Sequence, residues 1–126
     1  MNKTLLIVDD DISLCKMLEI LLKDLCPIKS FYDVKSAAKY LDDHQEDISL
    51  MMLDYNIGSD NGVNFYKQEV LGKGLTIPAV LISGFIVTQL KTKEELDELD
   101  SMFKRVIEKP FDFVELRDYL EREYFH

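Results

Sequence analysis

The sequence predicts an α/β fold in which helices cover both faces of a parallel sheet, in three layers. Short apolar runs alternate with amphipathic segments five times along the chain, which is the pattern of repeated strand–helix units. The clearest runs, residues 5–8 and 50–53, contain no polar residue, as expected of strands buried on both faces. A length of 126 residues, 47% of them hydrophobic, fits one folded domain.

Each predicted strand is a short apolar run with a polar or turn-forming residue at its end. Asp9 ends the first, Asp54 the third, Ser83 the fourth and Lys109 the fifth, while Pro78 lies near the start of the fourth. In chain order, the predicted strands are residues 4–8, 28–32, 48–53, 77–82 and 106–107.

Each predicted helix has apolar residues at helical spacing, such as Leu14 and Leu18 in the first. Pro27 ends the first helix, and Gly72 and Gly74 close the third. In chain order, the predicted helices are residues 12–26, 34–43, 63–71, 87–102 and 111–124. Residues 56–62, rich in Asn, Asp and Gly, are predicted to form a loop. The fourth helix carries an acidic run that indicates a solvated face: Glu94, Glu95, Asp97, Glu98 and Asp100.

The charge balance excludes two classes of partner. The chain has 15 Lys and Arg against 24 Asp and Glu, for a net charge of −9. Direct binding to nucleic acid needs a basic face, and an anionic membrane would repel this chain. No stretch approaches the ~20 apolar residues of a membrane span. A protein partner is therefore expected.

Cysteine and histidine usage adds no further site. Cys15 and Cys26 are too few for a disulfide framework, and we interpret them as two buried thiols near one helix face. His44 and His126 are isolated, so we expect surface residues rather than metal ligands. No signal peptide is visible. These features predict a protein of the reducing cytoplasm.

The polar residues at the strand ends predict a site. The carboxyl ends of parallel strands meet at one edge of the sheet, where ligands bind in such folds. Asp9, Asp10 and Asp54 would converge there, and three carboxylates need a cation such as Mg²⁺. Lys109 and Ser83 are suited to contact a phosphoryl group, and one carboxylate is then left as a nucleophile toward phosphorus.

Each residue also has a plainer interpretation. An aspartate of the 9–11 run can cap the following helix, and that role suffices for Asp11. Asp54 can begin an Asx turn, Ser83 can be a turn residue, and Lys109 can be a solvated lysine. Capping does not explain two more acids directly after a buried strand, so the metal interpretation is favoured.

Four segments, each at the end of a predicted strand, carry a resemblance to a known family. They are LIVDDD at 6–11, LDYN at 53–56 followed by Gly62, LISG at 81–84 and EKPF at 108–111. In this order they resemble the receiver domain of bacterial two-component response regulators, over essentially the whole chain. The resemblance implies a flavodoxin-like, doubly wound sheet of five strands in the order 2-1-3-4-5, with five helices.

The resemblance also implies roles for single residues. Asp54 would be the phosphoacceptor and would share in binding Mg²⁺. Asp10 would hold the metal directly, Asp9 largely through water, and Asn56 through its backbone carbonyl.

For the phosphoryl group, the resemblance implies contacts from Ser83 and Lys109. Pro110 would follow Lys109 through a cis peptide bond, which is plausible only before proline.

Three positions bear on how the site would be regulated. Gly58 stands where the family often has proline, which should loosen the loop. Val106 stands where the family usually has the aromatic residue of its switch. Phe85 lies two residues after Ser83, where the resemblance implies that the family tunes hydrolysis of the acyl phosphate. A large apolar side chain there would hinder the attacking water, so we expect slow autodephosphorylation.

These expectations combine into one receiver domain over residues 1–126, with no output domain. It would accept a phosphoryl group from a sensor histidine kinase or histidine phosphotransfer protein. It would catalyse its own phosphorylation and dephosphorylation but act on no external substrate. It would then relay the group, or bind a downstream protein through the face of the fourth helix, fifth strand and fifth helix. Whether phosphorylation drives homodimer formation stays open.

Two other functions remain as alternatives. A pseudo-receiver would bind its partner without phosphorylation, which Val106 and Gly58 support weakly. A flavodoxin-like cofactor binder is disfavoured, because no phosphate-binding loop follows the first strand.

Overall fold

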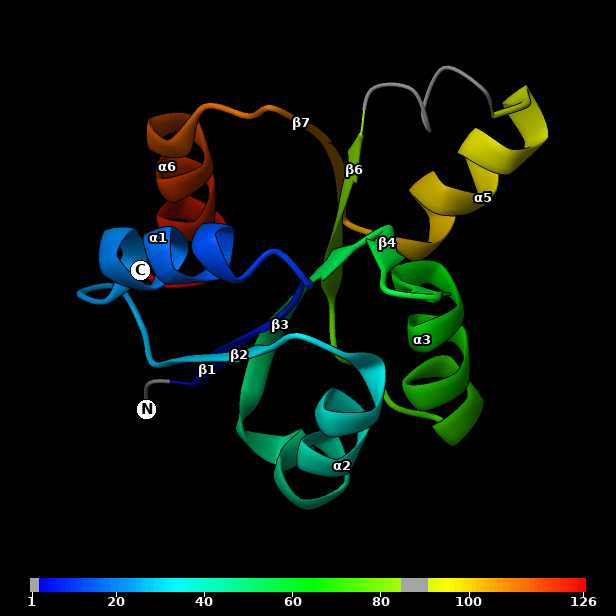
Figure 1. Cartoon of the computed structure of the whole chain (residues 1–126), viewed down its shortest axis with the longest axis horizontal. Coiled ribbons are helices and arrows are strands. Elements are labelled where there is room, and N and C mark those ends of the chain that lie inside the picture. Colours follow the sequence, from blue (N-terminus) through cyan, green and yellow to red (C-terminus); the bar gives the residue numbers. More distant parts are fainter. Residues whose placement is uncertain (1–2, 85–90) are drawn as a thin grey trace.

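A five-stranded parallel sheet forms the centre of the computed structural model, which describes residues 3–84 and 91–126 (Figure 1). The sheet has the order β2-β1-β3-β6-β7, and every neighbouring pair is parallel. Its strands are β1 (Thr4–Val8), β2 (Ile28–Phe31), β3 (Ile48–Asp54), β6 (Ala79–Gly84) and β7 (Arg105–Lys109). Counted along the chain, this is the order 2-1-3-4-5, so the predicted flavodoxin-like fold is confirmed.

Helices cover both faces of the sheet, which completes the three predicted layers. In the described part of the chain they are α1 (Ile12–Leu22), α2 (Val34–His44), α3 (Gly62–Glu69), α5 (Lys93–Met102) and α6 (Phe113–Glu123). Helices α1 and α6 lie on one side of the sheet, and α2, α3 and α5 lie on the other (Figure 1). Two short 3₁₀ helices, Gln45–Asp47 and Leu71–Lys73, follow α2 and α3. No helix within these two ranges is long and apolar enough to cross a membrane.

The core consists of two apolar layers, one on each face of the sheet. Along β1, Leu5 and Ile7 pack in the layer under α1 and α6, while Leu6 and Val8 pack in the layer under α2, α3 and α5. Both faces of the strand are therefore buried, which explains why its sequence is apolar without alternation.

The first helix is shorter than its sequence predicts. We expected it to run to residue 26, but α1 ends at Leu22. The guanidinium of Arg117 on α6 donates to the Leu21 carbonyl at 2.7 Å and pairs with Asp24 at 2.8 and 2.9 Å. These bonds satisfy groups at the helix end, which lies before Pro27. Cys26 thus lies outside the helix, although both cysteines are free and buried as predicted.

The acidic fourth helical segment also begins later than predicted. We expected residues 87–102, of which 87–90 lie outside the described residues, and α5 begins at Lys93. Thr92 caps it in a capping box: its hydroxyl accepts from Glu95 N at 3.2 Å, and the Glu95 carboxylate accepts from Thr92 N at 3.1 Å. The five acids of the run are exposed, as expected.

The remaining boundaries moved by one to two residues, except in the predicted loop. Asp112 caps α6, so that helix begins at Phe113 rather than at residue 111. The predicted loop contains a small antiparallel hairpin formed by β4 (Asn56–Ile57) and β5 (Asp60–Asn61).

Candidate functional site

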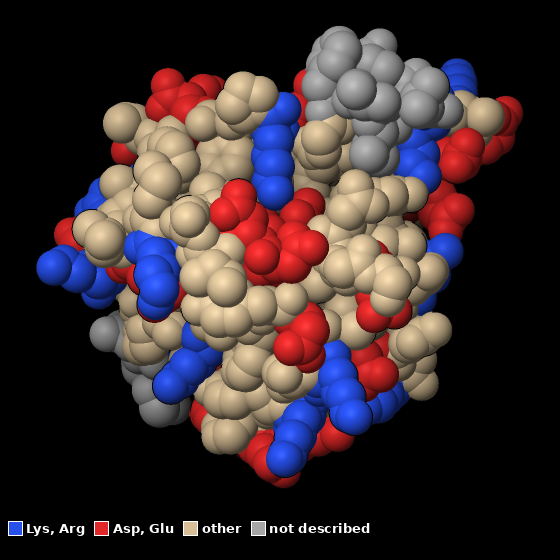
Figure 2. Space-filling view, in the orientation of Figure 1, with Lys and Arg blue, Asp and Glu red and all other residues tan. Residues whose placement is uncertain are grey.

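Four polar residues meet where the strands of the sheet end. Asp9 directly follows β1, Asp54 ends β3, Ser83 lies near the end of β6, and Lys109 ends β7. The strands are parallel, so these ends share one edge of the sheet. Figure 2 shows acidic side chains gathered near the middle of this face, beside a basic one. The Lys109 ammonium lies 3.2 Å from Oδ2 of Asp54 and 3.3 Å from Oδ2 of Asp9.

The site has more negative than positive charge. Asp9, Asp10 and Asp54 each offer one carboxylate oxygen, and these oxygens lie within 4.8 Å of one another. Asp9 and Asp54 are only 3% and 7% exposed, whereas Asp10 is exposed. One ammonium cannot neutralise three carboxylates, and hard oxygen donors open to solvent on one side are the set that Mg²⁺ takes. The residues present therefore fit this ion.

Asp9 is held in place through its backbone and its side chain. Its N–H donates to the Phe31 carbonyl at 3.0 Å, and its Oδ1 accepts from Asp11 N at 2.9 Å. Its carbonyl accepts from the Cys15 thiol at 3.6 Å. Burial first, and then the Asp9 charge, raise the pKa of Cys15 to about 12, so the thiol keeps its proton. Asp9, Asp10 and Asp11 therefore have different roles. Asp11 caps α1, because its side chain accepts a hydrogen bond from Leu14 N at 3.0 Å, whereas Asp9 and Asp10 belong to the carboxylate cluster.

The environment of Asp54 disfavours its charged form. Burial first, and then the neighbouring Asp9 charge, raise the pKa of Asp54 to about 6, while Lys109 opposes the shift. A divalent cation in the acidic cluster would stabilise the carboxylate form of this residue.

Position 62 lies so close to the Asp54 backbone that only glycine fits there. A Cβ at position 62 would overlap the carbonyl oxygen of Asp54 and would lie 3.1 Å from Leu53 Cβ. The Gly62 N–H donates to the Tyr55 carbonyl at 3.0 Å. Helix α3 begins at Gly62 and is capped by Asn61. The sequence indicated Gly62 only as part of a motif, whereas the structure shows that it leaves room for the backbone behind Asp54.

The other predicted residues lie around this cluster. Asn56 is exposed at the start of β4, two residues after Asp54. Ser83 is buried and follows Ile82, the residue of β6 that pairs with Asp54. The peptide bond between Lys109 and Pro110 is cis, as predicted.

A family comparison decides the identity of the domain. The family model for the response regulator receiver domain matches residues 5–121. The chain belongs to this family. Its sequence matches none of the curated proteins with which it was compared.

Solved receiver domains share the fold of this one. The receiver domain of Francisella response regulator 1452 superposes with a TM-score of 0.78 at 18% identity, covering 96% of this chain and 95% of that one. A CheY-like receiver domain from Methylobacillus flagellatus gives 0.74 at 22%, covering 97% and 98%. The receiver domain of NtrX from Brucella abortus gives 0.76 at 22%, covering 94% and 95%.

Gly58 forms part of a defined turn in this receiver domain. It lies in the turn of the β4–β5 hairpin with a φ of 62°, a conformation open to glycine and closed to proline. Its N–H donates to Oδ2 of Asp10 at 2.9 Å. The conformational freedom of glycine is used here to form the turn, and the expected loosening of the loop stays a prediction.

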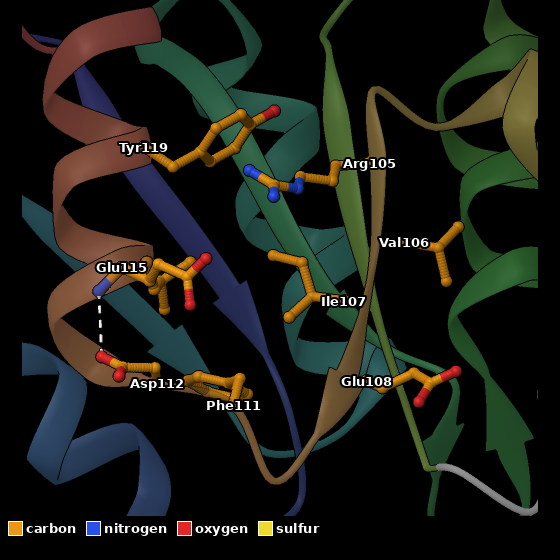
Figure 3. Close-up of a pocket in the computed structure, with 9 residues that line it drawn as sticks. Arg105, Val106, Ile107, Glu108, Phe111, Asp112, Glu115 and Tyr119 are labelled. Carbon is orange, nitrogen blue, oxygen red and sulfur yellow. Dashed lines mark hydrogen bonds between the residues drawn. The ribbon is translucent and has the colours of Figure 1, made fainter.

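Val106 packs on the face of β7 away from α6. Figure 3 shows Val106 on the opposite side of the strand from Tyr119 and Ile107. It contacts the apolar layer under α3 and α5, to which Tyr55 also contributes. The other face of β7 borders a cavity of about 200 Å³ against α6 (Figure 3). The receiver domain therefore has an aliphatic side chain on the α5 side of β7. Phe85, the third position that the sequence links to regulation, after Gly58 and Val106, lies outside the described residues.

Sequence reasoning missed a contact beside Asp54. The Lys91 ammonium donates to the Tyr55 hydroxyl at 2.5 Å and lies 4.6 Å from the centroid of the Tyr55 ring. The two residues are 36 positions apart, and Lys91 lies outside the four motif segments and the predicted strand ends. No pattern in the sequence therefore indicated this contact.

The histidines form no site in the described part of the chain. His126 is exposed, as predicted. His44 is half-buried rather than fully on the surface, because its ring stacks on Tyr40 with centroids 4.0 Å apart.

Proposed function

We propose that this receiver domain accepts a phosphoryl group on Asp54 from a phosphohistidine of a sensor kinase or a histidine phosphotransfer protein. The observation that carries the proposal is the convergence of the Asp9, Asp10 and Asp54 carboxylates with Lys109 at one sheet edge. In the proposed site, Asp9, Asp10, Asp54 and the Asn56 carbonyl hold Mg²⁺.

The transfer exchanges one bond to phosphorus for another. A carboxylate oxygen of Asp54 attacks the phosphorus of the phosphohistidine, and the phosphorus–nitrogen bond breaks. The electron pair of that bond stays on the imidazole nitrogen, which takes up a proton. Asp54 is left as an acyl phosphate, which water later hydrolyses to aspartate and phosphate.

The residues around Asp54 supply charge and orientation. Lys109 already contacts Asp54 Oδ2, so its ammonium is placed to neutralise a phosphoryl oxygen. Ser83, buried near the end of β6, donates a hydrogen bond from its hydroxyl to a second phosphoryl oxygen. Mg²⁺, when bound, supplies further neutralisation of the phosphoryl oxygens. Phosphoryl transfer requires mainly such positioning and charge stabilisation.

Phosphorylation then changes a surface that a protein partner reads. The proposed face comprises α5, β7 and α6, because Lys109 of the site ends β7. The change requires two arrangements of this face that differ in free energy by an amount that phosphorylation shifts. The two free, buried thiols fit a reducing compartment, so we keep the cytoplasm as the proposed location.

The test is phosphate incorporation from a small-molecule phosphodonor. Wild type with Mg²⁺ should incorporate one phosphate per chain, and chelation of the metal should abolish the reaction. Asp54→Asn, which keeps the shape of the side chain, should incorporate none. Failure of the wild type to incorporate phosphate would favour the pseudo-receiver alternative instead.

A further inference from the structure

The residue after Asp54 is linked by its side chain to the start of α5. Tyr55 accepts a hydrogen bond from Lys91 at 2.5 Å, and the same ammonium lies over its ring. This hydrogen bond raises the pKa of Lys91, so the side chain stays charged at neutral pH. Lys91 directly precedes Thr92, the capping residue of α5. Lys91 therefore connects Tyr55 to the residue that caps α5.

Glu95 joins this contact to the helix itself. Its carboxylate lies 3.5 Å from the Lys91 ammonium and also accepts from Thr92 N in the capping box. The Lys91 side chain is only 17% exposed, so the contact is shielded from solvent more than an ordinary surface ion pair. Tyr55, Lys91 and Glu95 thus form one connected unit at the beginning of α5.

The rest of α5 is weakly attached to the domain. Among its ten residues, all of them described, only Leu99 is buried. Leu99 packs in the apolar layer that α3 also covers, with Met102 partly buried against it. The ion pair between Lys67 and Glu98 at 2.7 Å is exposed, a type of contact that contributes little. Figure 1 shows α5 at the periphery of the molecule. A contact at its first turn therefore has a large influence on its position.

The backbone at Asp54 and Tyr55 has little room to move. The Tyr55 N–H donates to the Ile82 carbonyl at 2.7 Å, and its carbonyl accepts from Gly62 N at 3.0 Å. Gly62 is itself packed against the Asp54 carbonyl. Because this backbone is held on both sides, a group added to the Asp54 side chain has to be accommodated by rearrangement of neighbouring side chains, and the Tyr55 side chain is the next one in the chain.

We propose that the Tyr55–Lys91 contact holds the start of α5 in its unphosphorylated position and is broken when Asp54 is phosphorylated. The inference rests on the proposed function, because it requires phosphorylation of Asp54. It assigns the link between Asp54 and α5 to Tyr55, in a receiver domain that has Val106 where the family usually has the aromatic residue of its switch. The contact stabilises one of two arrangements of α5, and phosphorylation favours the other.

Hydrogen exchange of the α5 amides tests the inference, with beryllofluoride and Mg²⁺ as the mimic of the phosphoryl group. Tyr55→Phe removes the hydroxyl and keeps the ring, and Lys91→Met removes the ammonium and keeps the stem. Lys67→Met is the matched control, because Lys67 pairs with α5 without contacting Tyr55.

In wild type, beryllofluoride should accelerate exchange in the first turn of α5 by about fivefold or more, the range of typical coupling between sites. Tyr55→Phe and Lys91→Met should show this faster exchange without ligand and change less than about twofold on ligation. By reciprocity, both should bind beryllofluoride about fivefold more tightly than wild type. Lys67→Met should respond as wild type does.

Two results would count against the inference in different ways. If both variants exchange and bind as wild type does, the Tyr55–Lys91 contact is not the link, and the proposed function is unaffected. If wild type shows no Asp54-dependent binding of beryllofluoride by fluorine NMR, the proposed function fails and this inference fails with it.

Discussion

The Lys109 ammonium lies 3.2 Å from Oδ2 of Asp54, although 55 residues separate the two in the chain. The same ammonium lies 3.3 Å from Asp9, so one cation serves two buried carboxylates. This arrangement makes Lys109 both a competitor of a metal ion and a partner of a phosphoryl group, and the two roles can be separated.

Lys109→Met should affect metal binding and phosphorylation in opposite directions. Without the ammonium, the three carboxylates attract a cation more strongly, so Mg²⁺ should bind about fivefold more tightly at pH 8, where the carboxylates are ionised. Phosphate incorporation should fall by about 10²-fold, because a charge that stabilises the transferring group is lost. Titration with Mg²⁺ and a phosphorylation time course measure the two effects. Weaker Mg²⁺ binding would argue against a shared carboxylate cluster.

The stability of the metal-free protein should depend on pH through Asp54. The pKa of Asp54 is about 6 in the folded protein, above its ordinary value of 3.8. Between these values the folded state holds a proton that the unfolded state has released. The free energy of unfolding should therefore fall as the pH rises from 4 to 6, by up to about 3 kcal/mol.

Urea unfolding of wild type and Asp54→Asn across this pH range isolates the effect, because other carboxyl groups titrate in both proteins. The variant should be the more stable of the two at pH 7 by a margin that shrinks towards pH 4. Parallel curves for the two proteins would contradict the assignment to Asp54.

Gly62→Ala should damage both stability and the site. The added Cβ overlaps the Asp54 carbonyl oxygen, so the backbone must shift at a cost of about 1–3 kcal/mol. The shift displaces the Asp54 carboxylate, and phosphate incorporation should fall with it. Gly84→Ala is the control, because a Cβ there meets no atom of the described residues within 4 Å, and its free energy of unfolding in urea should stay within about 0.5 kcal/mol of wild type. Equal stability of the two variants would show that the close approach is unimportant.

Phe85→Glu should accelerate the loss of phosphate from phosphorylated protein. The expectation comes from the resemblance to the receiver family, which implies that the position two residues after Ser83 tunes hydrolysis, and a large apolar side chain there would hinder the attacking water. The decay of the acyl phosphate after removal of the phosphodonor measures the rate in both proteins. An unchanged rate would refute the role assigned to Phe85.

Much of the sheet and of the site could be predicted from the sequence, because both depend on local patterns. An apolar run such as residues 5–8 indicates a strand by itself, and parallel strands bring their ends together. Asp9, Asp54 and Lys109 could therefore be placed at one edge before any contact was known, and they do meet there.

What could not be predicted depends on side-chain contacts away from the strand ends, which no local pattern indicates. Helix α1 ends at Leu22, where its last turn binds Arg117, 96 residues after Leu21. The tight turn at Gly58 depends on a conformation that sequence alone does not specify, and it binds Asp10 across 48 residues. The Tyr55–Lys91 contact is likewise a property of packing between elements, which periodicity does not report.

Mapping the phosphorylated residue tests the central claim most directly. Protein phosphorylated in the presence of Mg²⁺ is treated with borohydride, which reduces an aspartyl phosphate to homoserine, and its peptides are sequenced by mass spectrometry. The account predicts homoserine at position 54, with Asp9 and Asp10 unmodified. Homoserine at position 9 or 10, or none in the chain, would contradict it.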